Sequence, residues 1–202
     1  MSIRPDGRRY SSPPEKEDNW AIRVRLQISN RVRDLALFNL AIDSKLRGCD
    51  LVHLRVEDVM QADQVRTRAL VSQRKTGAPV QFEITEQARA AIAYWVRGKN
   101  LKGSEWLFPS RVDRTQLMTT LQYGRLVDEW IAAIGLAPSA YGTHSLRRPK
   151  AALIYRKTGN IRAVQLLLGH TKLDSTVRYL GVELEDALAI AESIDVEPLA
   201  LA

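Results

Sequence analysis

A histidine and a tyrosine near the C-terminal end stand where a fold could bring an imidazole and a phenol into one pocket. His170 and Tyr179 lie nine residues apart. An apolar run with the i, i+3, i+4 spacing of a helix ends at Gly169, so we expect His170 at a helix end. A second short helix, capped by Asp174 or Ser175, would carry Tyr179. Each also has an ordinary structural interpretation, the tyrosine as a packing residue and the histidine as part of a helix cap.

Two segments upstream offer cationic groups. Arg47 stands beside Gly48 at a predicted connection between helices, where it needs an anionic partner, either Asp50 or a bound phosphate. Lys75 is predicted at the tip of a β-hairpin. A lysine in that place usually faces solvent, but its mobility would let the ammonium reach a neighbouring phosphate.

A second histidine, His144, precedes Arg147 by three residues. If Thr143 caps a helix here, the imidazole and the guanidinium project from one helix face near the positive end of the helix dipole. That arrangement favours an anion. The alternative is a histidine in a capping turn and a surface arginine that binds a carboxylate.

The charge of the chain is unevenly distributed. The net charge is +7 over 202 residues, yet residues 179–202 contain six acidic residues and no lysine or arginine. The body of the protein is therefore strongly basic, which favours a polyanion partner, with nucleic acid the leading candidate. Basic surfaces also serve solubility, so charge alone does not decide the partner.

Composition narrows the class of protein. A chain of this length with 45% hydrophobic residues can bury one well-packed domain. It has no apolar run approaching the ~18 residues that span a bilayer and no apolar signal core at its N-terminus, so we expect a cytoplasmic protein without a membrane partner. The single cysteine, Cys49, suits a reducing compartment and is most simply a small buried hydrophobe.

The periodicity predicts a mainly α fold with one small antiparallel β-sheet (α+β). Residues 1–19, with Arg4, Arg8 and Arg9, are expected to form a flexible basic arm. No internal repeat is present. The predicted elements are a helix that starts within 20–26, a core helix after Ser29 or Asn30 as N-cap, a short helix at 50–54, a hairpin at 64–84, a helix at 86–97 ended by Gly98, a long helix at 116–134 and a helix from Thr143.

The residues singled out above resemble, in order and in structural context, the active-site series of the tyrosine recombinases, also called the phage integrase family. The matching positions are Arg47 in LRGCDL, Lys75 on the hairpin, His144 and Arg147 in HSLR, His170 after Gly169, and Tyr179. The resemblance covers about residues 20–195 and corresponds to the family's catalytic domain, here expected at 20–182. Short members that invert fimbrial promoter segments consist of little more than this domain.

The resemblance implies site-specific DNA strand cleavage and rejoining through a 3′-phosphotyrosyl intermediate. Tyr179 would be the nucleophile, because a phenolate that stays attached stores the energy of the broken bond. Arg47 and Arg147 would neutralise the phosphate, and His170 would donate a hydrogen bond to it. The family pattern makes Lys75 the general acid, and His144 would assist proton transfer at the tyrosine or support the phosphate. No cofactor or metal is expected.

The resemblance also implies partners. Double-stranded DNA would be bound by a homo-oligomer, a tetramer in the assembled synapse. Residues 183–202 form an acidic segment with an apolar stripe, expected to dock on a neighbouring protomer or, alternatively, on its own domain. The resemblance does not include the N-terminal helical domain that many members carry. Additional DNA binding would therefore come from the arm, from an accessory DNA-binding protein or from the avidity of a tetramer.

One residue departs from the expected pattern. Pro149 falls two residues after Arg147, where a continuing helix would lose an N–H and kink at a cost of ~3 kcal/mol. The alternative is a DNA-binding or regulatory protein on the same fold that is catalytically idle, because of Pro149 or because it lacks the N-terminal domain. A helical interaction protein that does not bind DNA remains a third hypothesis, in which the six matching residues are a coincidence.

Overall fold

The structure is a computed structural model that describes residues 16–180. Most of the predicted arm and all of the acidic segment at 183–202 lie outside these residues. The helices are α1 (Lys16–Ile28), α2 (Val32–Ser44), α3 (Gly48–Leu51), α4 (Val56–Val59), α5 (Glu86–Lys99), α6 (Thr120–Ala133), α7 (Arg148–Thr158), α8 (Ile161–Leu168) and α9 (Leu173–Leu180), with 3-10 turns η1 (Pro138–Ala140) and η2 (Ser145–Arg147). The strands are β1 (Met60–Gln61), β2 (Gln64–Val65), β3 (Arg68–Ser72) and β4 (Pro79–Glu83).

The expected mainly α fold with antiparallel strands is confirmed, with one addition. The predicted hairpin is β3–β4, in which Arg68 pairs with Glu83 and Ser72 with Pro79. A second, smaller antiparallel pair, β1–β2, precedes it. Its strands have two residues each, too short for an alternating pattern to show in the sequence.

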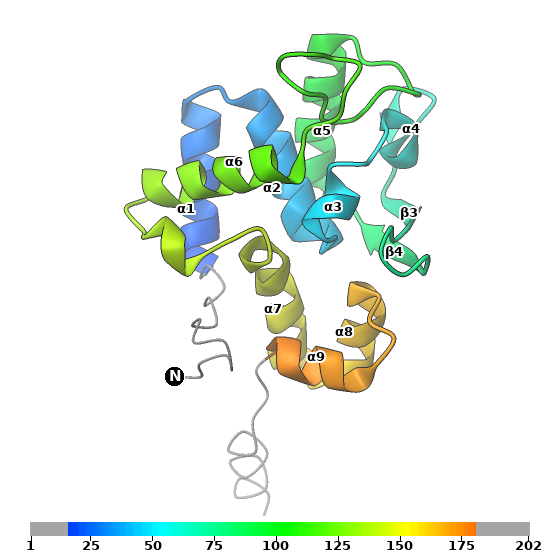
Figure 1. The fold of residues 1–202 in the computed structure, drawn as a ribbon, viewed down its shortest axis with the longest axis vertical. Coiled ribbons are helices and arrows are strands. Elements are labelled where there is room, and N and C mark those ends of the chain that lie inside the picture. The colour runs from blue at the N-terminus through cyan, green and yellow to red at the C-terminus, as the bar shows by residue number, and fades with distance from the viewer. Residues whose placement is uncertain (1–15, 181–202) are drawn as a thin grey trace, which may run out of the picture.

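The main core is built around α2. Nine of its thirteen residues are buried, and Figure 1 shows the helix between α1 and α5. Trp130 of α6 closes this core with its ring edge-to-face against Phe38, 5.7 Å between centroids. A helix with this much buried surface is stable only where other elements surround it.

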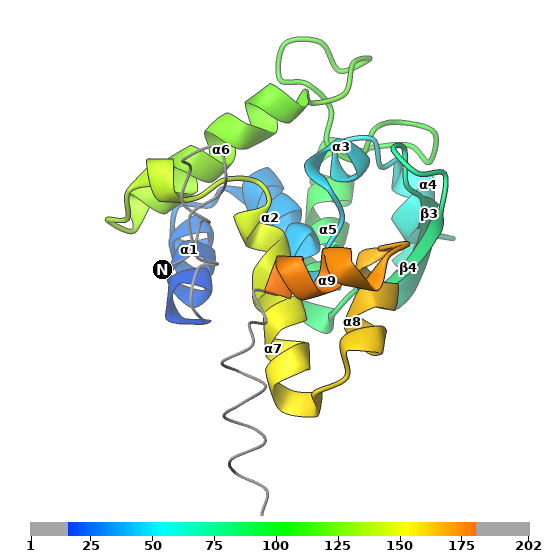
Figure 2. The same ribbon diagram turned by 60° about the horizontal axis from the view of Figure 1, so that its bottom comes forward.

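A second, smaller core joins α7, α8 and α9. Ala151, Val164 and Leu168 are fully buried there, and Tyr179 packs against them. Figure 2 shows α9 lying across α7 and α8, on the side of α3 and the hairpin. This packing brings the C-terminal helices to the part of the fold that carries Arg47.

Several predicted helix boundaries are wrong. The N-cap of α2 is Arg31 rather than Ser29 or Asn30, because the chain turns at Asn30 with a φ of 50°. α5 continues through Gly98 to Lys99, since the ~1 kcal/mol cost of a helical glycine is offset by burial of the same turn, which includes Trp95.

α6 begins at Thr120, four residues later than predicted from Gln116. A reciprocal cap sets this start, because the Gln122 N–H donates to the Thr119 hydroxyl and the Thr119 N–H donates to the Gln122 side chain. At the N-terminal end, α1 begins at Lys16, inside the range predicted as arm.

Pro149 does not kink a helix. It occupies the first turn of α7, which begins at Arg148 after the separate 3-10 turn η2. A proline in the first helical turn loses no hydrogen bond, because the N–H groups there have no partner within the helix. The helix expected from Thr143 is therefore two elements, and Pro149 favours the start of the second.

No helix within residues 16–180 is long and apolar enough to cross a membrane.

Candidate active site

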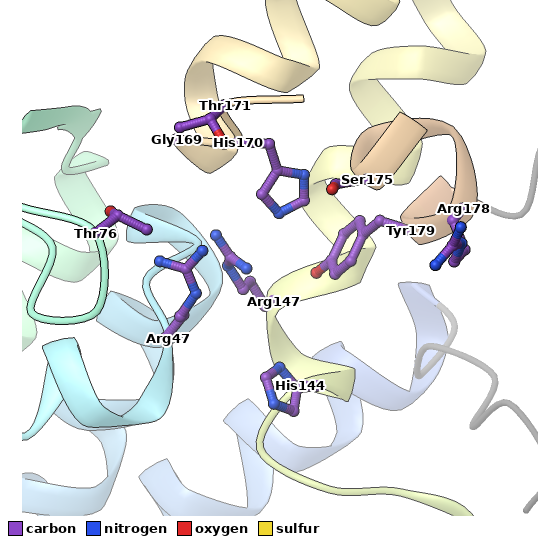
Figure 3. A pocket seen from close by; sticks show the side chains of 10 residues that line it. All are labelled: Arg47, Thr76, His144, Arg147, Gly169, His170, Thr171, Ser175, Arg178 and Tyr179. Carbon is purple, nitrogen blue, oxygen red and sulfur yellow. The ribbon is translucent and has the colours of Figure 1, made fainter. Parts of the chain in front are cut away.

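Five of the six predicted site residues line one pocket of about 380 Å³ between α3, η2 and the α8–α9 turn (Figure 3). The five are Arg47, His144, Arg147, His170 and Tyr179, and the pocket is completed by Thr76, Gly169, Thr171, Ser175 and Arg178. These residues come from segments more than a hundred positions apart, so the fold alone brings them together.

Arg147 is the most buried cation in the pocket, with 3% of its surface exposed. Its Nε donates to the carbonyl of Lys45, and its Nη2 donates to the carbonyl of Leu168 at 2.6 Å. Burial, with a contribution from Arg47, lowers the pKa of Arg147 below its ordinary value. An arginine remains charged in spite of this, so the pocket contains a fixed positive charge that has no carboxylate partner among the described residues.

Arg47 stands at the N-cap of α3 and donates through Nη1 to the side-chain oxygen of Gln73 at 2.6 Å. The predicted alternative, a pair with Asp50, is not formed. The Asp50 carboxylate instead accepts the backbone N–H of Arg74 at 2.8 Å. The other donors of Arg47 therefore remain available to an anion in the pocket.

His170 follows Gly169, which ends α8 as predicted; the glycine has the left-handed conformation, with a φ of 63°. Its backbone N–H donates to Gln165, and its Nδ1 lies 3.1 Å from the hydroxyl of Thr176. Burial, followed by the charges of Arg147 and Arg47, lowers the pKa of His170 to about 4. The imidazole is therefore neutral at physiological pH.

Tyr179 lies on α9, which begins at Leu173, so Asp174 and Ser175 belong to its first turn rather than to a cap. The hydroxyl of Tyr179 is buried and has no hydrogen-bond partner within residues 16–180. Burial raises the pKa of this phenol, and Arg147 and Arg148 partly oppose the rise. A buried hydroxyl without a partner is costly, which indicates a place for a polar ligand.

His144 precedes η2 and is exposed at the edge of the pocket, below Tyr179 and Arg147 in Figure 3. Thr143 does not cap a helix. The turn is held instead by Ser145, whose hydroxyl accepts the Gly142 N–H at 3.1 Å. The imidazole and the Arg147 guanidinium thus reach the pocket from a tight turn.

Lys75 is the one predicted residue that does not line the pocket. It is exposed in the turn between β3 and β4, next to Thr76, which does line it. A lysine side chain of four methylene groups can move its ammonium by several ångströms, so its place at the edge is compatible with a transient contact.

Sequence reasoning missed three side chains that hold this site. Gln73 binds Arg47, Thr176 binds His170, and Arg148 lies with its guanidinium 5.6 Å from the Tyr179 ring. Gln73 and Thr176 are buried polar residues with no distinguishing local pattern. The signal for Arg148 was its position beside Arg147.

Comparison with known proteins shows which proteins this chain resembles. The chain is 30% identical over 167 residues to the probable integrase/recombinase YoeC of Bacillus subtilis, covering 83% of this chain and 87% of that protein. It is 30% identical to the tyrosine recombinase XerD of Haemophilus influenzae over 79% of this chain and 54% of that one. The chain therefore spans about half the length of the Xer relative.

Solved structures share the fold. The XerH site-specific recombinase bound to palindromic difH substrate matches with a TM-score of 0.72 at 18% identity, over 95% of this chain and 55% of that chain. The XerA recombinase matches with a TM-score of 0.69 at 18% identity, over 88% of this chain and 63% of that chain. The model of the phage integrase family matches residues 21–185, nearly the whole described chain. The protein therefore belongs to the phage integrase family, the tyrosine recombinases.

Proposed function

We propose that this protein is a site-specific DNA recombinase that cuts and rejoins double-stranded DNA through a covalent link to Tyr179. One observation carries the proposal. A buried tyrosine hydroxyl without a partner opens on a pocket that also holds the guanidiniums of Arg47 and Arg147. Two guanidiniums match the non-bridging oxygens of one phosphodiester, and the phenol supplies the nucleophile.

In the cleavage step, the Tyr179 oxygen attacks the scissile phosphorus and the bond from phosphorus to the 5′-oxygen breaks. The products are a 3′-phosphotyrosyl link and a free 5′-hydroxyl. The phenol must lose its proton, and we assign to His144, which lines the pocket, either assistance to this proton transfer or support of the phosphate. The leaving oxygen must gain a proton, and Lys75 supplies it from the hairpin tip.

Charge on the phosphate is balanced by groups that are already in place. Arg147 is held by two backbone carbonyls and Arg47 by Gln73, so neither must reorganise much as negative charge develops. Because His170 is neutral, it carries one N–H. If the Thr176 hydroxyl donates to Nδ1, that proton lies on Nε2 and is directed at the phosphate.

Rejoining is the same reaction in reverse with another strand. A 5′-hydroxyl attacks the phosphotyrosine, Tyr179 leaves, and the phosphodiester is restored. The bond energy is conserved in the link, so the scheme needs no nucleotide cofactor. Exchange between two duplexes requires several protomers on DNA, so we infer a homo-oligomer, tetrameric in the synapse and aided by an accessory DNA-binding protein where the arm does not suffice. The reaction requires access to DNA, and we infer the cytoplasm as the place of action.

The position of Pro149 supports an active enzyme over the catalytically idle alternative. One ground for that alternative was a kinked helix that misdirects Arg147, whereas the proline begins α7 and Arg147 lies buried in the pocket.

Covalent trapping tests the proposal. The protein is expressed in its native host, denatured, and any DNA that remains attached is sequenced. Wild type is expected to yield adducts that end at a discrete site, and Tyr179→Phe to yield none while still binding DNA. Tyr155→Phe, a half-buried tyrosine of the same small core, is the matched control and should yield wild-type adducts. Salt-sensitive DNA binding without any adduct from wild type would contradict the proposal.

A further inference from the structure

Gln73 is a buried polar residue that has no role in the reaction scheme above. It is 1% exposed and stands between β3 and the hairpin turn. Its backbone closes the turn, because its N–H donates to Ala78 at 2.9 Å and its carbonyl accepts the Gly77 N–H at 2.7 Å. A buried side-chain amide in this place must have hydrogen-bond partners, and two of them, Arg47 and Leu168, lie outside the hairpin.

The Gln73 side chain can adopt only one orientation. Its oxygen accepts from Arg47 Nη1 at 2.6 Å and from the Thr76 hydroxyl at 2.9 Å, and its nitrogen donates to the Leu168 carbonyl at 3.1 Å. A guanidinium only donates and a carbonyl only accepts, so a flipped amide would lose both contacts.

The Leu168 carbonyl links this amide to the second arginine. It also accepts Arg147 Nη2 at 2.6 Å. The chain of contacts from Arg47 through Gln73 and Leu168 to Arg147 therefore sets the spacing of the two guanidiniums. Gln73 makes the only hydrogen bond of the Arg47 side chain within residues 16–180.

The end of α8 is packed tightly against this amide. A Cβ added at Gly169 would lie 2.7 Å from the Gln73 nitrogen and 2.4 Å from a methyl carbon of Val80. The positive φ of Gly169 and this close approach both exclude a side chain. The hairpin and the α8 terminus thus form one fitted contact, with Gln73 at its centre.

We propose that Gln73 is a positioning residue that holds Arg47 at the distance from Arg147 that one scissile phosphate requires. The inference rests on the proposed function, because it assigns both guanidiniums to the same phosphate. Gln73 is not among the residues that line the pocket and acts through Arg47. Misplacement of such a group by about 1 Å can lower a rate by about 10²-fold.

The first test measures single-turnover formation of the phosphotyrosyl link on a DNA containing the site recovered by trapping. Gln73→Met, which keeps the side-chain length without hydrogen bonds, is expected to slow the reaction about 10- to 100-fold. On a DNA with a methylphosphonate at the scissile position, which has no non-bridging charge to neutralise, the deficit should fall below about threefold. Gln81→Met, an exposed glutamine of the same hairpin, is the control and should react like wild type.

A third DNA, with sulfur replacing the 5′-bridging oxygen, distinguishes an effect that acts through Arg47 from one that acts through Lys75. A thiolate leaves without a proton, so this DNA does not need the general acid. The deficit of Gln73→Met should persist on it. Three results would overturn the proposal: a Gln73→Met deficit that disappears only on the sulfur-containing DNA, a deficit of equal size on all three DNAs, or no deficit on any of them.

Gln73→Glu repeats the test if the methionine variant does not fold. It keeps the length and the contacts to Arg47 and Thr76, but it cannot donate to Leu168 when ionised. The ionised carboxylate also offsets the Arg47 charge. We therefore expect the Gln73→Glu deficit, like that of Gln73→Met, to persist on the sulfur-containing DNA and to shrink on the methylphosphonate DNA.

A second measurement does not depend on catalysis. Amide hydrogen exchange in the DNA-free protein should be about tenfold faster in Gln73→Met than in wild type within the turn 73–78 and at His170, with α2 unchanged. If amide exchange in the turn is the same in Gln73→Met and wild type, the positioning role is overturned, whether or not wild type forms an adduct. Absence of a wild-type adduct would by itself contradict only the proposed function.

Discussion

The imidazole of His170 lies edge-to-face against the ring of Tyr179, with centroids 5.6 Å apart and planes at 82°. The guanidiniums of Arg147 and Arg148 each lie 5.6 Å from the centroid of the same ring. Aromatic rings attract cations at their faces and favour edge contacts with other rings. These contacts to its ring orient the Tyr179 side chain, and they leave its hydroxyl available to a ligand in the pocket.

The contact between Thr176 and His170 gives a first prediction. Thr176 is fully buried, and Thr176→Val removes the hydroxyl beside Nδ1 with little change in shape. Loss of one hydrogen bond of about 1 kcal/mol should slow phosphotyrosyl formation about fivefold to tenfold. Single-turnover cleavage measures this, with Thr120→Val, an exposed threonine of α6, as the control. A wild-type rate for Thr176→Val would show that the His170 tautomer does not depend on this contact.

The exposed position of Lys75 gives a second prediction. Lys75→Ala should slow cleavage by ~10² to 10⁴, the usual contribution of a general acid, without affecting stability. A 5′-bridging sulfur should restore most of the lost rate, because the thiolate needs no proton. Lys102→Ala, an exposed loop lysine, should behave as wild type on both DNAs. A Lys75→Ala deficit that the sulfur does not relieve would assign the lysine to phosphate binding instead.

The lowered pKa of His170 predicts a dependence of stability on pH. The value of about 4 in the folded protein is below the ~6.5 of an unfolded histidine, so between these pH values the unfolded chain binds a proton that the folded protein does not. This contribution is fully present above pH ~6.5 and is lost as the pH falls toward 4. Urea unfolding at pH 7.5 and 4.5 should show a larger loss for wild type than for His170→Gln. An equal loss in the two proteins would contradict the burial of this imidazole.

A partly buried ion network around Asp43 gives a fourth prediction. The Asp43 carboxylate accepts Lys150 Nζ at 2.8 Å and both the N–H and hydroxyl of Thr85, and Lys150 also pairs with Glu83. Asp43→Ala leaves the N–H and hydroxyl of Thr85 without this acceptor and leaves Lys150 with Glu83 alone. It should lower the free energy of unfolding by about 3–5 kcal/mol. Urea denaturation measures the change, and Asp128→Ala, an exposed carboxylate of α6, should change stability by less than about 0.5 kcal/mol. A small effect at Asp43 would mean that water replaces the carboxylate.

The sequence by itself determined the features that depend on a few neighbouring residues. The apolar spacing before Gly169 predicted α8 and its end at this glycine, and the turn residues around Lys75 predicted the β3–β4 hairpin. The types and order of the six candidate site residues were likewise visible in the chain and led to the family that the comparisons show. Local backbone preferences and side-chain chemistry act over a few residues, so a single chain displays them.

Tertiary structure alone decided which of these groups meet. Arg47 has Gln73 rather than Asp50 as its partner, and Arg147 bonds the carbonyls of Lys45 and Leu168, which local spacing cannot indicate. Pro149 begins α7 instead of kinking it, because the chain forms a separate 3-10 turn before that helix. These outcomes depend on how α2, α7 and α8 pack. Packing balances burial against hydrogen bonding over the whole domain, and no short stretch of sequence records that balance.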